Sequence, residues 1–289
     1  MGGSPVSVYL NGQFLAEEQA LIPIDDRGFL FADGVYEVVH VYNGRPFEWD
    51  RHMARLNRSL TAVEMAAVDA SELAEIRDRL IRENAARESA LYIQITRGVQ
   101  RRQHTPPSPG TVRPTVLLWA RAVDPFDREF VEQGISVITV PDDRWGKVWI
   151  KTIGLLPNVL AKGKAHALGV YDAVFVRDGM VTEATSANIF RVANGIVQTA
   201  PVTNYILPGV TRAVVLEIAR EAGLPVLEEP FAVEDLYRSD ELFLTGTTTE
   251  VLPIGIVDGR PIGSGSAGPV ALDLLQRFKE RIAAVSKGG

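Results

Sequence analysis

Residues 171–195 read YDAVFVRDGMVTEATSANIFRVANG, and this stretch predicts strands that follow one another through tight turns. Asp178-Gly179 and Asn194-Gly195 are dipeptides that adopt positive φ easily, as a two-residue β-hairpin turn requires. The runs expected to form the strands are Tyr171–Val176, Met180–Glu183 and Ala187–Val192. The stretch therefore predicts a hairpin-rich sheet in this part of the chain.

Helices alternate with strands on either side of this stretch. Apolar residues at helical spacing predict helices at Pro157–Leu168, Thr211–Ala222 and Val270–Val285. Nearer the N-terminus, Asn11-Gly12 and Asn43-Gly44 predict two more hairpins. Two helices are expected at 51–67 and 72–86, with Asp50 and Ser71 as their N-caps, and further strands at 91–97, 115–120 and 148–153.

The order of these elements indicates an α+β protein with two lobes. Residues 122–134 are polar and acidic, which favours a linker. We therefore expect an N-terminal domain at 1–121 and a larger C-terminal domain at 135–289. A cleft between two lobes is a common place for a small-molecule site, so we expect the functional site there.

The composition excludes several classes of protein. The chain has 30 basic and 36 acidic residues, a net charge of −6, and a pI near 5.4, so a nucleic-acid-binding protein is not expected. It has no cysteine, which excludes disulfides and thiolate metal sites, and His40, His52 and His166 lack metal-ligand spacing. Neither a membrane span nor a secretory signal is recognisable, so a cytoplasmic protein without a metal is expected.

Lysine is rare, which shortens the list of candidate amine nucleophiles. The chain has only six lysines, at positions 147, 151, 162, 164, 279 and 287. Lys151 lies in the apolar run Val-Trp-Ile-Lys-Thr-Ile, where a charged amine is costly to bury unless it is paired or loses its proton. Such a lysine suits Schiff-base chemistry, although Lys147 shares its strand parity and remains a rival.

Other segments carry groups that suit a phosphorylated cofactor. Glu183 follows a hairpin and precedes Ala-Thr-Ser-Ala-Asn, and a carboxylate of this kind can hold a proton on a pyridine nitrogen. Leu207-Pro-Gly-Val-Thr211 opens a helix, whose free N–H groups bind phosphate. Thr245-Gly-Thr-Thr-Thr249 offers hydroxyls, and Arg55 offers a positive charge.

Arg102 and His104 form a further candidate pair, in the loop rich in Arg and Pro between residues 98 and 113. Two residues apart in an extended segment, their side chains project to the same side. Together they can hold a carboxylate.

In this order the segments resemble the fold-type IV aminotransferases that use pyridoxal 5'-phosphate, and in particular the D-amino acid aminotransferases. The resemblance spans residues 8–281. The seven segments that carry it are Arg27–Glu37, His52–Leu56, Tyr92–Gly98, Trp149–Thr152, Val181–Asn188, Leu207–Arg212 and Leu244–Thr248.

The resemblance implies a role for each candidate. Lys151 would form the Schiff base with the cofactor, and Glu183 would contact its pyridine nitrogen. The phosphate would be bound by Arg55, Val210, Thr211 and Thr247, with Leu207 packed under the ring. Tyr36, Arg102 and His104 would bind the substrate carboxylate, with the Arg102–His104 loop supplied by the partner subunit of a homodimer. The implied reaction is ping-pong transamination between D-amino acids, such as D-alanine and D-glutamate, and 2-oxo acids.

Two departures keep alternatives open. The chain has Thr185-Ser-Ala187 where the D-amino acid branch often has three serines, and Gly246 where that branch has serine. An (R)-selective amine aminotransferase, a branched-chain L-amino acid aminotransferase or an aminodeoxychorismate lyase would share the fold. A non-catalytic cofactor-binding protein is an alternative of another class, which the presence of Lys151, Glu183 and Arg55 together disfavours.

Overall fold

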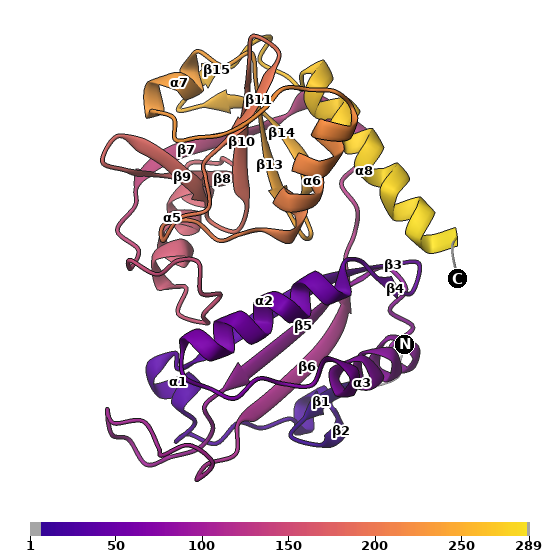
Figure 1. Ribbon diagram of the computed structural model, residues 1–289, viewed down its shortest axis with the longest axis vertical. Coiled ribbons are helices and arrows are strands. Elements are labelled where there is room, and N and C mark those ends of the chain that lie inside the picture. Colours follow the sequence, from indigo (N-terminus) through magenta and orange to yellow (C-terminus); the bar gives the residue numbers. More distant parts are fainter. Residues whose placement is uncertain (1–6, 288–289) are drawn as a thin grey trace. The chain divides into compact units, whose positions relative to one another are not determined.

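The computed structural model describes residues 7–287 and divides into two compact units (Figure 1). Unit 1 comprises the chain up to Asp124 together with Ile150–Gly154, and unit 2 comprises the rest. The division after Asp124 falls inside the segment 122–134 that we expect to be a linker, and the limits of the domains stay a prediction. The composition does not indicate that Ile150–Gly154 returns to unit 1.

Unit 1 is built on a six-stranded antiparallel sheet in the order β2-β1-β6-β5-β3-β4. The strands are β1 (Ser7–Leu10), β2 (Gln13–Ala16), β3 (Gly34–Tyr42), β4 (Arg45–Pro46), β5 (Ser89–Thr96) and β6 (Thr115–Ala122). The helical elements are η1 (Glu17–Gln19), α1 (Arg27–Phe31), α2 (Trp49–Ala62) and α3 (Ala70–Glu83).

Helices α2 and α3 cover one face of this sheet because each has one apolar side. In α2, Met53, Leu56 and Leu60 recur at helical spacing and are buried, and the helix packs on β3. Helix α3 packs on β1 and β6 in the same way (Figure 1). The core of unit 1 therefore lies between these helices and the sheet.

Unit 2 contains a nine-stranded mixed sheet. Its main path is β12-β11-β10-β13-β14-β7-β8-β9, with β15 paired to β14. The strands are β7 (Ile135–Pro141), β8 (Asp172–Arg177), β9 (Met180–Ala184), β10 (Asn188–Ala193), β11 (Ile196–Thr199), β12 (Val226–Glu228), β13 (Glu241–Gly246), β14 (Glu250–Val257) and β15 (Arg260–Pro261). Its helices are α4 (Arg128–Gln133), α5 (Leu156–Ala167), α6 (Val210–Glu221), α7 (Val233–Tyr237) and α8 (Pro269–Lys287).

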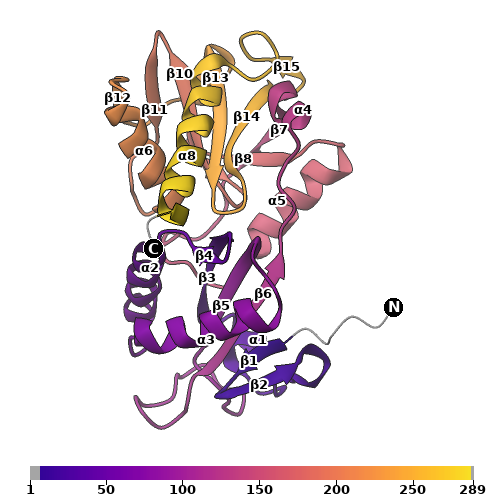
Figure 2. The ribbon, with the colours of Figure 1, turned by 90° about the vertical axis from the view of Figure 1, so that its right-hand side faces the viewer.

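The sheet of unit 2 curls back on itself. Strand β9 ends the path and β10 lies several strands away along it, yet only three residues join them. The Ala184 amide donates a hydrogen bond to the Ala187 carbonyl at 2.8 Å, which closes this connection. Helices α6 and α8 lie side by side and pack on β13, while α5 packs on β7 and β8 (Figure 2).

The four hairpin turns predicted from the sequence are confirmed. The dipeptides starting at Asn11, Asn43, Asp178 and Asn194 all have positive φ at both residues, as type I′ turns require. They join β1 to β2, β3 to β4, β8 to β9 and β10 to β11. Asp258-Gly259 forms a fifth turn of this kind between β14 and β15, which the sequence analysis missed.

Three local predictions were wrong. Residues 148–153 do not form a strand, because only Thr152 bridges to Val35. Ser71 is not the N-cap of α3, because the Asp69 carboxylate accepts a hydrogen bond from the Ser71 amide and takes that position. Helix α2 begins at Trp49, after an N-cap at Glu48, so Asp50 is not the N-cap but lies in the first turn. A negative charge there interacts favourably with the helix dipole.

Candidate active site

Lys151 lies in unit 1, in an irregular segment held along the start of β3. The Tyr36 amide donates to the Lys151 carbonyl at 3.0 Å, and the Ile153 amide donates to the Gly34 carbonyl at 3.2 Å. From α2, the Ser59 hydroxyl accepts a hydrogen bond from the Lys151 amide at 3.2 Å. Tertiary hydrogen bonds therefore fix this segment, although it is not a regular strand.

The Lys151 amine lies over an aromatic ring and has no acidic partner among residues 7–287. Its Nζ is 4.1 Å from the centroid of the Tyr36 ring. The rival Lys147 is exposed, whereas Lys162 donates to the Tyr171 carbonyl and pairs with Asp172 at 3.4 Å. An amine that is partly buried and not paired with a carboxylate suits a nucleophilic role, so the geometry favours Lys151.

Arg55 belongs to a buried charge cluster with Glu37 and His52. Arg55 donates to the two Glu37 oxygens from Nε at 2.6 Å and from Nη2 at 2.8 Å, and His52 Nδ1 lies 2.8 Å from Glu37 Oε2. Burial raises the pKa of Glu37, but Arg55 and His52 outweigh burial and hold it well below its usual value. Burial also lowers the pKa of His52, against the smaller opposing effect of Glu37. Glu37 is therefore ionised, and its two bonds fix the plane of the Arg55 guanidinium.

The sequence analysis missed the partners of Arg55, although two signals were available. Glu37 interrupts the apolar run Val-Tyr-Glu-Val-Val of β3, and a charge at such a position needs a partner. His52 and Arg55 are three residues apart on α2, so they share a helix face.

Arg102 and His104 are exposed, and both lie on the ring of Phe31. The Arg102 guanidinium carbon is 5.1 Å from the Phe31 centroid, and the His104 ring centroid is 5.6 Å from it. The buried Arg27 holds the loop by donating to the carbonyls of Gln103 at 2.8 Å and His104 at 3.4 Å. No hydrogen bond or ring contact joins Arg102 or His104 to Tyr36 within the described part of this chain.

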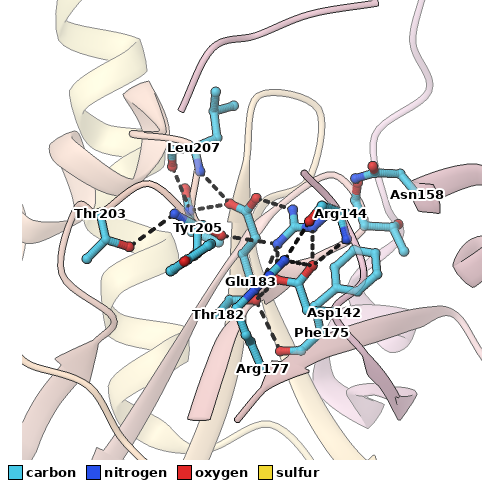
Figure 3. Close-up of polar contacts among 12 residues, drawn as sticks. Asp142, Arg144, Asn158, Phe175, Arg177, Thr182, Glu183, Thr203, Tyr205 and Leu207 are labelled. Atoms are coloured by element: carbon cyan, nitrogen blue, oxygen red, sulfur yellow. Dashed lines mark hydrogen bonds and ion pairs between the residues drawn. The ribbon is translucent and has the colours of Figure 1, made fainter. Parts of the chain in front are cut away.

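In unit 2, the Glu183 carboxylate accepts hydrogen bonds from three separate segments of the chain (Figure 3). Arg144 Nη1 donates to Oε1 at 2.6 Å, while Asn188 Nδ2 and the Leu207 amide donate to Oε2 at 3.0 and 2.9 Å. The Glu183 side chain is only 7% exposed. Charge-assisted bonds of this kind favour the ionised form of a carboxylate.

Asn188 brings three predicted elements of the site together in unit 2. It lies at the start of β10, pairs in register with Thr245 at the end of β13, and donates to both Glu183 and the Leu207 carbonyl. Helix α6 begins just after Leu207, with the N-cap Gly209. A Cβ at Gly209 would lie 2.1 Å from Asn188 Oδ1, so only glycine allows this approach.

The start of α6 and the end of β13 offer donors that suit an anion. Gly209 has no side chain to cap α6, so the amides of Val210 and Thr211 are left for an external acceptor. The buried Thr245 hydroxyl has no hydrogen-bond partner among the described residues. Thr247 follows Gly246 in the turn after β13, and both residues are half-buried.

These donors fit pyridoxal 5'-phosphate in their chemistry. Backbone amides at a helix N-terminus and threonine hydroxyls suit its phosphate, an ionised carboxylate suits its ring nitrogen, and a lysine amine suits its aldehyde. The orphaned Thr245 hydroxyl is the kind of buried polar group that a bound ligand satisfies.

The fold and these groups define a class of protein, and the comparisons with known proteins agree. The model of the family described as amino-transferase class IV matches residues 34–257, and the chain belongs to this family. It is therefore a fold-type IV transaminase, a class that uses pyridoxal 5'-phosphate.

Within the family, the chain is similar to curated D-alanine aminotransferases. It is 37% identical to that of Staphylococcus aureus (strain N315) over 277 residues, which covers 95% of this chain and 97% of the relative. It is 38% identical to that of Listeria monocytogenes serotype 1/2a (strain 10403S) over 279 residues, covering 96% of each.

Among solved structures, the chain resembles branched-chain amino acid aminotransferases. The Thermoproteus uzoniensis enzyme with norvaline superposes with a TM-score of 0.80 at 29% identity, covering 96% of this chain and 94% of that one. The Escherichia coli enzyme gives 0.84 at 25% identity, with the same coverage. A third enzyme of this kind, solved with pyridoxamine 5'-phosphate, gives 0.87 at 28% identity, again with the same coverage. Among residues 7–287, no helix has the length and apolar character that crossing a bilayer requires.

Proposed function

We propose that this chain transfers the amino group of D-amino acids, of the D-alanine and D-glutamate class, to 2-oxo acids. The observation that carries the proposal is the similarity to D-alanine aminotransferases along nearly the whole of both chains. The Arg102 and His104 pair supports it, because a carboxylate-binding pair is of use only to an amino acid substrate and not to a simple amine.

The proposed cofactor-binding residues are Arg55, Lys151, Glu183, Leu207, Val210, Thr211 and Thr247. Pyridoxal 5'-phosphate supplies an electron-accepting ring that makes the substrate Cα–H acidic. Lys151 Nζ would hold the cofactor through its aldehyde carbon, and the same amine would move a proton from the substrate Cα to that carbon. Glu183 would keep a proton on the ring nitrogen, while Arg55 and the first amides of α6 would bind the phosphate.

The proposed substrate-binding residues are Tyr36, Arg102 and His104. Together they hold the α-carboxylate in one direction, so that only one enantiomer presents its Cα–H to Lys151. Because Arg102 and His104 make no contact with Tyr36 within the described part of the chain, we propose that their loop serves the site of a second copy in a homodimer. Exposed apolar side chains around the loop support such an interface: Leu21, Ile24 and Phe29 are 78%, 80% and 74% exposed. A cytoplasmic location is part of the same proposal.

Half-reactions of the cofactor-loaded protein test the proposal. We expect D-alanine to react faster than L-leucine or (R)-1-phenylethylamine in stopped-flow absorbance measurements. Arg102→Ala removes a charge-assisted hydrogen bond of about 1.5–3 kcal/mol, so D-alanine affinity is expected to fall roughly 10- to 150-fold. The amine, which has no carboxylate, is expected to be unaffected. Arg101→Ala, a neighbouring exposed arginine of the same loop, is the matched control.

Mixing two variants tests whether the loop acts in trans. Lys151→Ala and Arg102→Ala are each expected to be nearly inactive toward D-alanine at low substrate concentration. In a mixed dimer, the site that keeps Lys151 receives an intact loop from the other subunit. Re-associated mixtures are then expected to recover about a quarter of wild-type activity, since half the dimers are mixed and one of their two sites is intact. No recovery would place the loop in its own subunit's site.

A branched-chain L-amino acid or (R)-amine aminotransferase is the second candidate. The structural similarity to branched-chain enzymes and the glycine at position 246 favour it. Fastest reaction with L-leucine, or an equal loss for acid and amine substrates in Arg102→Ala, would support this candidate and contradict the first.

A further inference from the structure

A buried network of charges lies behind Glu183 (Figure 3). Arg144 donates to Glu183 at 2.6 Å through Nη1 and to Asp142 through both Nε and Nη2, each at 2.9 Å. Asp142 also accepts a hydrogen bond from the Thr182 hydroxyl at 3.0 Å and pairs with Arg177 at 3.1 Å. Glu183 is thus the last member of a chain of alternating charges.

The inner three groups of this network are shielded from water. The side chains of Asp142, Arg144 and Glu183 are 0%, 4% and 7% exposed, whereas Arg177 is 21% exposed. Burial lowers the pKa of Arg144, but its two carboxylate partners outweigh burial and raise it. Burial raises the pKa of Asp142, yet Arg144 and Arg177 hold it below its usual value. Both groups are therefore charged at neutral pH.

Arg144 makes more contacts than a simple ion pair with Glu183 would need. Its guanidinium binds Asp142 side-on through two parallel bonds, which leaves Nη1 aimed at Glu183. Arg144 Nη2 also donates to the Tyr205 carbonyl at 3.2 Å, and the guanidinium lies 4.2 Å from the Phe175 ring centroid. All three guanidinium nitrogens therefore donate hydrogen bonds, which fixes the orientation of the Nη1–H group that points at Glu183.

The net charge of the network affects how strongly Glu183 attracts a cationic partner. Asp142 and Arg144 cancel, so the buried trio with Glu183 carries one net negative charge, and the more exposed Arg177, which pairs with Asp142, balances that charge at the outer end of the network. An arginine alone behind Glu183 would cancel the carboxylate and repel a protonated ring nitrogen. With Asp142 in place, Arg144 orders Glu183 and favours its ionised form without removing the negative field that a cationic partner needs.

We infer that Arg144, clamped by Asp142, is a positioning residue that keeps Glu183 ionised, so that the shared proton rests on the ring nitrogen of the cofactor and not on the carboxylate. The inference rests on the proposed function, because it takes Glu183 as the partner of that nitrogen. It adds two residues, Asp142 and Arg144, neither of which the sequence pattern singled out.

The position of the proton is measurable directly. Protein reconstituted with pyridoxal 5'-phosphate labelled with ¹⁵N at the ring nitrogen is expected to give the chemical shift of a protonated pyridine. In Arg144→Gln the signal is expected to move toward that of a neutral pyridine. The half-reaction with D-alanine is expected to slow by about 10²-fold, the scale of losing one donor at a developing charge. In Arg144→Lys the ¹⁵N signal is expected to lie between those of the wild type and Arg144→Gln. Lysine keeps the positive charge but loses the paired bonds to Asp142.

Further variants separate this role from a merely structural one. Arg144→Gln leaves Asp142 buried beside Arg177 alone, so the double variant Asp142→Asn/Arg144→Gln, which removes one charge of each sign, carries the test if the single variant does not fold. It is expected to show the same movement of the ¹⁵N signal. Arg191→Gln is the matched control, because Arg191 is also largely buried in unit 2 and pairs with Asp235 at 3.5 Å, away from Glu183.

The outcomes distinguish this inference from the proposed function. A protein that binds no cofactor, or does not react with D-alanine, contradicts the proposed function itself. A wild-type protein that binds cofactor and reacts, with a ¹⁵N signal that stays at the protonated position in both Arg144 variants, overturns the inference and leaves the proposed function standing. A shift of equal size in Arg191→Gln would also overturn it.

Discussion

Replacing Glu37 by glutamine is expected to destabilise unit 1 far more than the loss of an ordinary ion pair. Glu37 is fully buried and accepts three hydrogen bonds, two from Arg55 and one from His52. Glutamine has nearly the same shape, so Glu37→Gln changes charge and hydrogen bonding with little change in volume. It removes the negative charge that Glu37 supplies to Arg55, whose side chain is only 5% exposed.

The magnitude follows from the loss of that buried negative charge. Removing one partner of a buried ion pair costs about 3–5 kcal/mol, which lowers the ratio of folded to unfolded protein roughly a hundred- to several thousand-fold. By contrast, Glu83 pairs with Arg79 at 2.6 Å on the surface of the same unit, where both side chains are at least a third exposed. Glu83→Gln is therefore expected to cost less than about 1 kcal/mol and serves as the control.

The loss is also expected to depend on pH with a definite sign. The pKa of Glu37 is lowered in the folded state, so its contribution is complete above the ordinary value of 4.5 and disappears as the pH falls through the folded value. The difference between wild type and Glu37→Gln should be largest at pH 7 and shrink below about pH 4.5. Guanidinium chloride unfolding of the cofactor-free protein, followed by circular dichroism, measures it at both pH values. The reasoning is refuted if Glu37→Gln loses no more stability than Glu83→Gln at pH 7.

Three shorter predictions concern other groups of the site. Borohydride reduction of the cofactor-loaded protein should label Lys151 in peptide maps, and a label on another lysine would contradict its proposed role. The lowered pKa of His52 means that the unfolded chain binds more protons below about pH 6.5, so stability should fall there. In His52→Gln the melting temperature should therefore fall less between pH 7.5 and pH 5.5 than it does in the wild type. Gly209→Ala should displace Asn188, whose Oδ1 lies 2.1 Å from the added Cβ, and weaken cofactor binding about tenfold in a fluorescence titration, whereas Gly163→Ala, in open space on α5, should not.

The features predicted correctly from the sequence depend on local chemistry. The hairpin at Asn194-Gly195 needs positive φ at two adjacent residues, and that preference belongs to the dipeptide itself. Helix α6 follows from its own apolar spacing and from the Pro-Gly that precedes it. The family resemblance was also carried by short segments, each of which is continuous in the chain.

The features that were missed depend on residues far apart in the sequence. Arg144 and Glu183 are 39 positions apart, and Arg55 and Glu37 are 18 apart, so no local pattern joins them. The run at 148–153 has the composition of a strand, but Lys151 and its neighbours are fixed by bonds to Tyr36, Gly34 and Ser59 instead. The conformation of this run is therefore set by tertiary hydrogen bonds and not by its strand propensity.

The candidate groups divide into two kinds according to their partners. Arg55 and Glu183 are already paired within their own units, with Glu37 and Arg144 respectively. Both would act on the cofactor through charged hydrogen bonds. The Lys151 amine and the Thr245 hydroxyl, by contrast, have no hydrogen-bond partner within the part of the chain that the structure describes. Groups that tune a ligand work best when they are ordered before it arrives, because no free energy is then spent on reorganising them during the reaction. Groups that bond a ligand directly must instead be without another hydrogen-bond partner. The pairing seen in each unit therefore matches what a preformed cofactor site requires, with ordered charges and vacant bonding groups on different residues.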